Sequence, residues 1–167
     1  LELVLTVSGV PEKAAPSGGE GFEIRRSYYT LDGAPADPAL VNQNQRLVVT
    51  LEVTEAGELP SHLLVVDMLP AGFEIANPAL VDSADLAALS WLPEKVEAAR
   101  LEFRDDRFVA ALERSGNEAR GFTLAYMVRA VTPGRFALPP ALVEDMYRPH
   151  LNARTASGRS EVIGIEP

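Results

Sequence analysis

The 167-residue chain contains no cysteine, which excludes disulfides, thiolate metal sites and a cysteine nucleophile. Its only histidines, His62 and His150, are isolated and belong to no H-E-x-x-H pair. The glycine-rich stretch 9–21 is not followed by the Lys-Ser/Thr of a phosphate loop, and no G-x-S-x-G elbow occurs. Asp105-Asp106 could bind a cation, but without further clustered carboxylates a hairpin turn is favoured. The sequence therefore predicts a non-enzyme without metal or cofactor.

Long apolar runs and an excess of positive charge are also missing. No run approaches the roughly 20 apolar residues of a membrane-spanning helix, and no signal-peptide pattern opens the chain. Asp and Glu number 24 against 15 Lys and Arg, which gives a net charge of −9. This charge repels nucleic acid and anionic lipid surfaces. We therefore expect neither nucleic-acid binding nor membrane insertion.

The composition that remains is that of a globular protein, with 47% hydrophobic and 23% charged residues. A chain of this length fits one domain around a single core, so residues 1–167 are expected to form one domain. The chain opens on Leu1, already in a strand-like alternation, instead of Met. This opening suggests a segment excised from a much larger multidomain protein.

Alternating apolar residues predict strands along most of the chain. Leu47–Val53 has the pattern of a one-sided strand, whereas the continuous apolar run 63–69 is typical of a central strand covered on both faces. Only Ser83–Leu92 has helical spacing. Further strands are expected at residues 1–7, 21–33, 100–113, 119–134 and 160–167. The pattern indicates an all-β antiparallel two-sheet sandwich with one short helix in a connection.

Adjacent polar pairs in the first half of the chain could form a recognition patch. Arg25-Arg26 and Tyr28-Tyr29 lie on one expected strand, where neighbouring side chains point to opposite faces. We therefore expect one tyrosine in the core and the other at a rim. Asp67 interrupts the apolar run of another strand, so it needs an arginine or other hydrogen-bond partners if it is buried.

The stretch with the most distinctive combination of residues is PPALVEDMYRPHLNARTASG, residues 139–158. It combines a Pro-Pro stop, a short alternating run, a methionine beside a tyrosine, and a Tyr-Arg-Pro turn. A plain connector needs fewer of these features. This stretch is therefore the site-like part of a sandwich that otherwise carries no recognisable chemistry.

Several segments, in this order, resemble the C-terminal macroglobulin-like domain of bacterial alpha-2-macroglobulins, the counterpart of the receptor-binding domain in the animal proteins. They are GFEIRRSYYTLDG, RLVVTLEV, LLVVDMLPAGFEIANP, RLEFRDDRFVAAL and FTLAYMVRAVTPGRFALPPALVEDMYRPHLNAR. The most specific are DMLPAGFEIANP and the series Thr-Pro-Gly-x-Phe, Pro-Pro and Glu-Asp-Met-Tyr-x-Pro. The resemblance extends over nearly the whole chain from about Gly21.

The resemblance implies a large periplasmic protein that traps proteases and that could be anchored to a bacterial membrane by a lipid. In such proteins a bait segment is cut, the molecule rearranges and the protease is caged. Some members carry a thioester formed by a Cys-x-x-Gln motif in another domain, and this chain has no cysteine for it. The resemblance implies that the present domain is non-catalytic. It would pack on the thioester-bearing domain, stabilise the uncleaved conformation and keep water from the thioester.

The resemblance points to a presenting loop within residues 139–158. Arg148 could pair with Glu144 or Asp145, and Pro149 would stiffen the turn. Its candidate interface residues are Met146, Tyr147, Arg148 and Pro149.

Two interpretations of the loop tip stay open. In one, Met146 and Tyr147 shield a thioester. In the other, Met146 continues the core alternation from Leu142, and Tyr147 packs on the rim of the sandwich. Two further functions also stay open for the whole chain: an autonomous extracytoplasmic binding or adhesion module, and a hydrolase with an unrecognised site.

Overall fold

The structure is a computed structural model that describes residues 16–57, 60–76, 89–92 and 98–165. The described residues form fourteen strands, and none of them lies in a helix. The strands are β1 Gly18–Glu20, β2 Phe22–Tyr29, β3 Pro35–Ala36, β4 Val41–Asn42, β5 Arg46–Glu55, β6 Ser61–Met68, β7 Phe73–Ile75, β8 Arg100–Phe103, β9 Arg107–Arg114, β10 Gly121–Ala130, β11 Gly134–Leu138, β12 Ala141–Asp145, β13 Arg148–Arg154 and β14 Gly158–Ile163.

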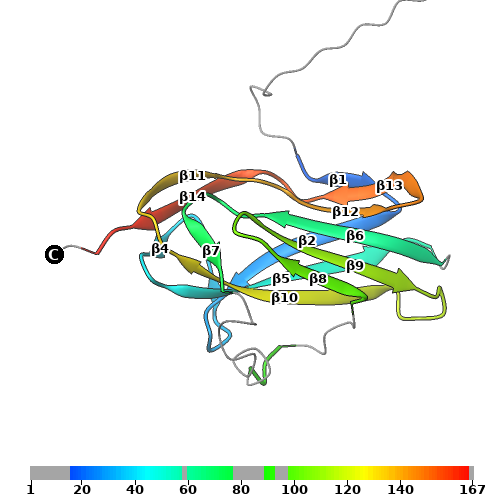
Figure 1. Ribbon diagram of the computed structural model, residues 1–167, viewed down its shortest axis with the longest axis horizontal. Coiled ribbons are helices and arrows are strands. Elements are labelled where there is room, and N and C mark those ends of the chain that lie inside the picture. Colours follow the sequence, from blue (N-terminus) through cyan, green and yellow to red (C-terminus); the bar gives the residue numbers. More distant parts are fainter. Residues whose placement is uncertain (1–15, 58–59, 77–88, 93–97, 166–167) are drawn as a thin grey trace, which may run out of the picture.

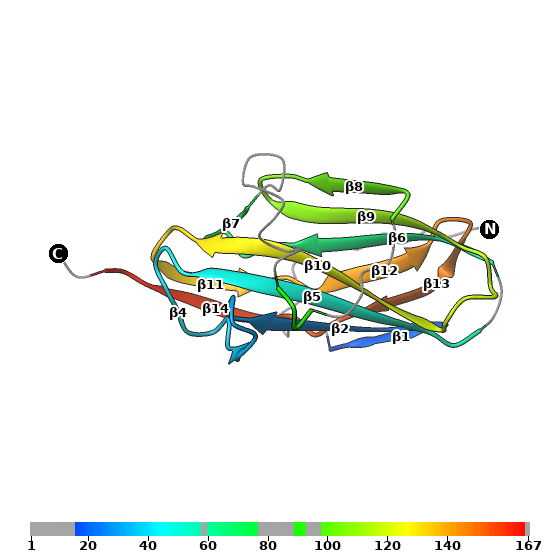
Figure 2. The same ribbon diagram turned by 90° about the horizontal axis from the view of Figure 1, so that it is seen from below.

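Two antiparallel sheets make up the body of the molecule. One has the strand order β1-β13-β12-β6-β9-β8, and the other has the order β3-β2-β5-β10-β7. A three-stranded sheet, β11-β14-β4, extends the sandwich and contains the parallel pair β14–β4. Figures 1 and 2 show this small sheet at the end that carries the C-terminus, with the turn between β12 and β13 at the opposite end. The predicted all-β two-sheet sandwich is confirmed, and the small third sheet was not predicted.

The core lies between the inner faces of the two large sheets. Each strand presents alternate residues to it, as the period of two in the sequence requires. Phe108 of β9 stacks on Tyr126 of β10, with ring centroids 4.4 Å apart, and so joins the two sheets at their centre. Other large, fully buried side chains of the core include Leu47, Leu51, Leu63, Leu112, Val49, Val53, Val65 and Val128.

The burial of the outer faces of β5 and β6 differs from the prediction for each strand. In β5, predicted to be one-sided, Val48 and Thr50 on the outer face are buried as well. In β6, predicted to be covered on both faces, Leu63 and Val65 are buried while Leu64 is only half-buried. The prediction was wrong because what covers a sheet's outer face is decided by segments distant in sequence.

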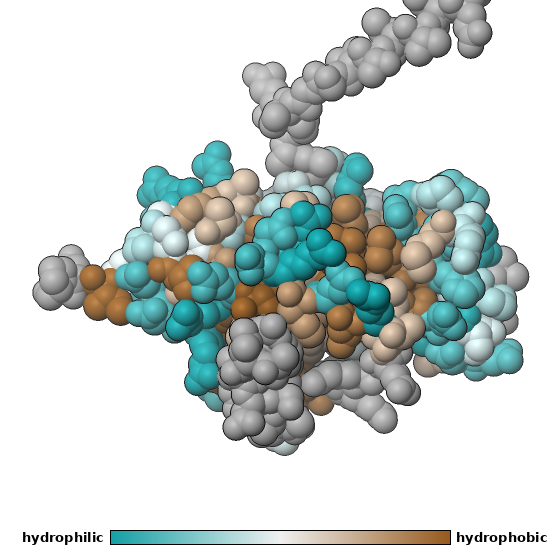
Figure 3. Space-filling model, in the orientation of Figure 1, coloured by the Kyte–Doolittle hydropathy of each residue, from teal (hydrophilic) through white to brown (hydrophobic). Residues whose placement is uncertain are grey.

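The outer faces of the two sheets are therefore unequal. On the five-stranded sheet, Trp91 of the connection between β7 and β8 packs on Tyr29, with ring centroids 5.1 Å apart, and Tyr29 stands opposite the buried Val48. On the six-stranded sheet the described residues place no segment over the outer face. Figure 3 looks onto this sheet and shows apolar side chains between hydrophilic ones.

Other expectations meet the structure in part. Asp105-Asp106 forms the predicted turn, between β8 and β9. The strand expected at residues 1–7 lies outside the described residues, as does most of the helix expected at 83–92. The described part of the latter, residues 89–92, forms a turn. No helix among the described residues is long and apolar enough to span a membrane.

Candidate functional site

Met146 and Tyr147 alone connect β12 to β13, so they form the tip of a two-residue hairpin. Both side chains point into solvent: Met146 is 45% exposed and Tyr147 is 77% exposed. Met146 is therefore not a core residue, and the interpretation in which it continues a buried alternation is wrong. Leu142, from which that alternation was counted, lies on the outer face and is itself 41% exposed.

A buried carboxylate fixes the backbone of this turn. Asp145 is 1% exposed, and its Oδ1 accepts hydrogen bonds from the backbone N–H groups of Tyr147 (2.9 Å) and Arg148 (3.1 Å). Neither tip residue has a positive φ, so this is not one of the primed turns that usually close two-residue hairpins. An aspartate at the first turn position supplies the constraint instead, by capping the following amides.

The same carboxylate holds Arg148. Its Oδ2 accepts bonds from Nε (2.9 Å) and Nη2 (2.5 Å) of Arg148, whose Nη2 also donates to the carbonyl of Pro60 (2.7 Å). Burial opposes ionisation of Asp145, yet the bonds from Arg148 and from the two amides outweigh it and hold the pKa of Asp145 below its ordinary value. The ionised carboxylate of Asp145, with both of its oxygens hydrogen-bonded, therefore holds both ends of the turn.

The neighbouring strand supports the tip from below. The amide of Met146 donates to the carbonyl of His62 on β6 (2.8 Å), and the Tyr147 ring meets the His62 ring edge-on at a centroid distance of 5.0 Å. Glu144 stands opposite Asn152 while Asp145 stands opposite Arg148, so residues 149–151 form a bulge in β13. A bulge of this kind re-aims the hairpin end.

All four sequence-predicted interface residues thus lie together at one end of the sandwich. Arg148 pairs with Asp145, one of its two expected partners, and Pro149 stands exposed in the bulge. Two supporting residues were not predicted from the sequence: Asp145 as the capping group and His62 as the ring beneath Tyr147. An aspartate placed directly before a two-residue turn is a signal that could have found the first; nothing in the sequence indicates the second.

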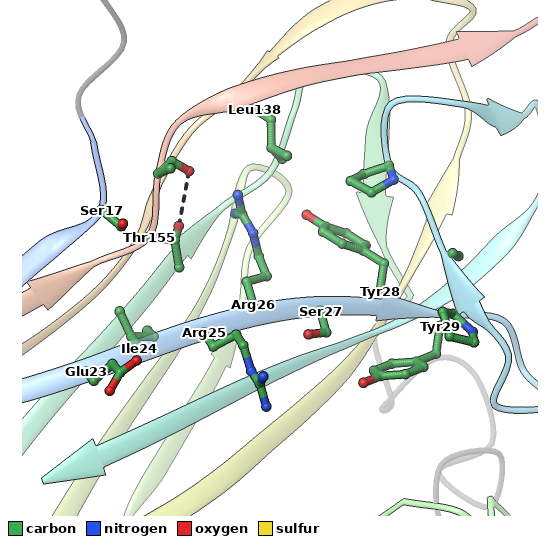
Figure 4. Close-up of a pocket in the computed structure, with 14 residues that line it drawn as sticks. Ser17, Glu23, Ile24, Arg25, Arg26, Ser27, Tyr28, Tyr29, Leu138 and Thr155 are labelled. Carbon is green, nitrogen blue, oxygen red and sulfur yellow. Dashed lines mark hydrogen bonds between the residues drawn. The ribbon is translucent and has the colours of Figure 1, made fainter.

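A second feature is an open groove of about 620 Å³ along β2. Figure 4 shows Arg26 and Tyr28 on the groove side of the strand, toward Leu138 and Thr155, and Arg25 and Tyr29 on the other side. The expected division of the tyrosines is confirmed, because Tyr28 is buried and Tyr29 lies at the rim.

Arg26, which lines the groove, belongs to a buried cluster of hydrogen-bonded polar groups. Nη1 of Arg26 contacts Oδ1 of Asp67 (2.5 Å), Nη2 of Arg26 donates to the carbonyl of Pro139 (2.8 Å), and the Tyr126 hydroxyl donates to Oδ2 of Asp67 (2.7 Å). Burial raises the pKa of Asp67, and the attraction of Arg26 opposes this. Asp67 has the arginine partner that its position required.

Sequence comparison gives consistent relatives. A family model described as the bacterial alpha-2-macroglobulin MG10 domain matches residues 21–150. The alpha-2-macroglobulin of Xylella fastidiosa is 40% identical over 168 residues, which cover 96% of this chain and 10% of the relative. That of Escherichia coli is 33% identical over 165 residues, covering 94% of this chain and 10% of the relative. The chain thus spans about a tenth of the length of these relatives.

Solved structures agree with the sequence matches. Salmonella alpha-2-macroglobulin reacted with methylamine superposes with a TM-score of 0.77 at 34% identity, over 92% of this chain and 10% of that one. Escherichia coli alpha-2-macroglobulin activated by porcine elastase gives a TM-score of 0.78 at 32% identity, over 92% of this chain and 14% of that one. The likeness extends over nearly the whole sandwich.

Proposed function

Because this chain belongs to the bacterial alpha-2-macroglobulin family and matches its MG10 domain, we propose that it is a non-catalytic domain of a longer, protease-trapping protein, hereafter the parent. In this proposal the domain packs on the thioester-bearing domain of the parent, or its equivalent, and stabilises the conformation that precedes bait cleavage. Target proteases meet the domain only through the parent, and the parent works in the periplasm.

The exposed Met146-Tyr147 tip is the observation that carries this proposal. A large aromatic ring that is 77% exposed contributes little to the sandwich itself. Tyrosine is among the residues that most often dominate binding energy at interfaces, and methionine adapts to irregular partner surfaces. Asp145 already holds the backbone of the tip, so little conformational entropy is lost when it docks.

The tip also suits the shielding of a hydrolysable bond. A thioester survives only where water and amines are kept away, which requires apolar groups held in one place. Met146 and Tyr147 supply the apolar surface, and the hydrogen bonds that the Tyr147 and Arg148 amides donate to Asp145 supply the fixed position. The Salmonella relative, which reacts with the small nucleophile methylamine, supports testing this idea with the same probe.

Removal of the domain tests the proposal at the coarsest level. Deleting the segment equivalent to residues 21–165 from the parent should leave the bait open to cleavage but destroy the compact resting conformation, because the docked tip is lost with it. Native electrophoresis and small-angle scattering of the uncleaved deletion variant, beside the intact parent, measure this. A deletion variant as compact as the intact parent, with unchanged inhibition of proteases, would refute the stabilising role.

A further inference from the structure

The outer face of the six-stranded sheet carries a continuous group of apolar side chains, which we call the outer patch. Strand register places Leu142 of β12 opposite Val66 of β6, and Val66 opposite Val109 of β9. Leu64 stands opposite Ala111 in the next row, and Met68 ends β6. The outer patch is therefore Leu64, Val66, Met68, Val109, Ala111 and Leu142.

This patch is open to solvent in the described structure. Met68 is 37% exposed and Leu142 is 41% exposed, while the other four are half-buried. Charged residues border it, as a polar rim borders the apolar centre of an interface. A continuous exposed apolar surface with a polar border is more often an interaction site than a face that stays in water. The bordering charges are Arg100, Glu102, Arg107, Glu113, Glu144 and Arg154.

The outer patch continues into the Met146-Tyr147 tip. His62 precedes Leu64 on the same face of β6 and stands opposite Glu113. The ring centroids of His62 and Tyr147 lie 5.0 Å apart, and the His62 carbonyl accepts a hydrogen bond from the Met146 amide. A partner that covers Tyr147 from this side therefore meets His62 first and Leu64 next. One partner surface can cover the tip and the patch without a gap.

The geometry points to the outer patch as an extension of the docking surface for the same domain of the parent that receives the tip. This assignment rests on the proposed function. The five-stranded sheet has its own cover in Trp91, whereas nothing among the described residues covers the six-stranded sheet. The relatives are about ten times the length of this chain, so neighbouring domains of the parent are the partner at highest local concentration.

The three methionines of the chain make the assignment testable, because they occupy different places. Met68 lies in the outer patch, Met146 lies at the tip, and Met127 is buried at 4% exposure. The uncleaved full-length parent is oxidised to low conversion with dilute hydrogen peroxide, and sulfoxide at each methionine is quantified by mass spectrometry. Each rate is divided by the rate of the same methionine in the parent unfolded in guanidinium.

If the outer patch is covered, the ratio for Met68 falls to within about twofold of the ratio for Met127. If it is open, Met68 keeps about a third of its unfolded rate, as its 37% exposure implies. A low ratio for Met146 with an open Met68 overturns this assignment and leaves the proposed function intact. A low ratio for Met68 with an open Met146 overturns the assignment, because the patch and the tip then share no partner, and it also contradicts the docked tip.

Two substitutions in the full-length parent complete the test. Leu142→Lys places a charge in the outer patch and should raise the Met68 ratio to about a third, several-fold above the intact parent. Leu40→Lys changes a residue that is 66% exposed outside the patch and should leave the ratio unchanged. An unchanged Met68 ratio in Leu142→Lys overturns the assignment, and a raised Met127 ratio identifies misfolding. Protection of Met68 that appears only at high parent concentration assigns the patch to a second copy and overturns the assignment.

Discussion

Replacing Tyr147 with alanine in the full-length parent should loosen the uncleaved conformation and, where the parent carries a thioester, speed its reaction with methylamine. Truncating a central interface tyrosine costs about 2 kcal/mol, which corresponds to a roughly 30-fold shift from the docked toward the undocked state. The fold of the domain itself should not change, because this ring is 77% exposed. Methylamine incorporation and native electrophoretic mobility measure the effect.

Tyr147→Phe is the matched control. It keeps the aromatic ring that meets His62 edge-on and removes only the hydroxyl, so it should behave like the unchanged parent. Unaltered methylamine reactivity and compactness in Tyr147→Ala would show that the tip shields nothing. A Tyr147→Phe variant as loose as Tyr147→Ala would assign the effect to the hydroxyl and contradict the role of apolar surface.

Arg26→Ala should destabilise the isolated chain by about 3–5 kcal/mol at neutral pH, the usual cost of leaving a buried charge without its partner. The Arg26 and Asp67 side chains are 4% and 1% exposed, so the substitution leaves a buried carboxylate without its arginine. Arg25→Ala, one position away on the opposite face, removes an exposed pair with Glu52 whose side chains are 71% and 38% exposed. It should leave stability unchanged. Urea unfolding of the three proteins measures the difference.

The deficit of Arg26→Ala should depend on pH with a defined sign. Burial raises the pKa of Asp67, and Arg26 opposes this, so the substitution moves the folded-state pKa further above the unfolded value. Ionised Asp67 then destabilises the fold above the unfolded pKa, and the penalty disappears as the pH falls below about 3.9. The combined variant Arg26→Met, Asp67→Leu, Tyr126→Phe should recover most of the lost stability. An equal deficit at neutral and acidic pH would contradict this assignment.

The sequence predicted those features of the fold that depend on local pattern. Alternation gave the long strands and the sandwich, and it required that Tyr28 and Tyr29 face opposite sides. It also required a partner for Asp67. It did not identify Arg26 in preference to Arg25, because which face of β2 turns inward depends on pairing with β5, which is not encoded within β2 itself. The short strands β4 and β11 escaped notice because two to five residues carry too little periodicity.

The candidate site was predicted as a set of neighbours in sequence, and its supports were not. Met146 to Pro149 stood out by composition and family resemblance. The ring of His62 under Tyr147 comes from another strand, through the pairing of β12 with β6. The outer patch escaped because an apolar run such as that of β6 looks the same whether a segment of its own chain or a separate domain covers its second face.

We expect the Met146-Tyr147 tip to be docked on another domain of the uncleaved parent. A photoreactive phenylalanine analogue placed at position 147 of the full-length parent tests it most directly. Irradiation before bait cleavage should cross-link position 147 to one short segment of another domain, and irradiation after cleavage should lose that product. Mass-spectrometric mapping that finds no interdomain cross-link in the uncleaved parent, or the same cross-link at equal yield after cleavage, would contradict the claim.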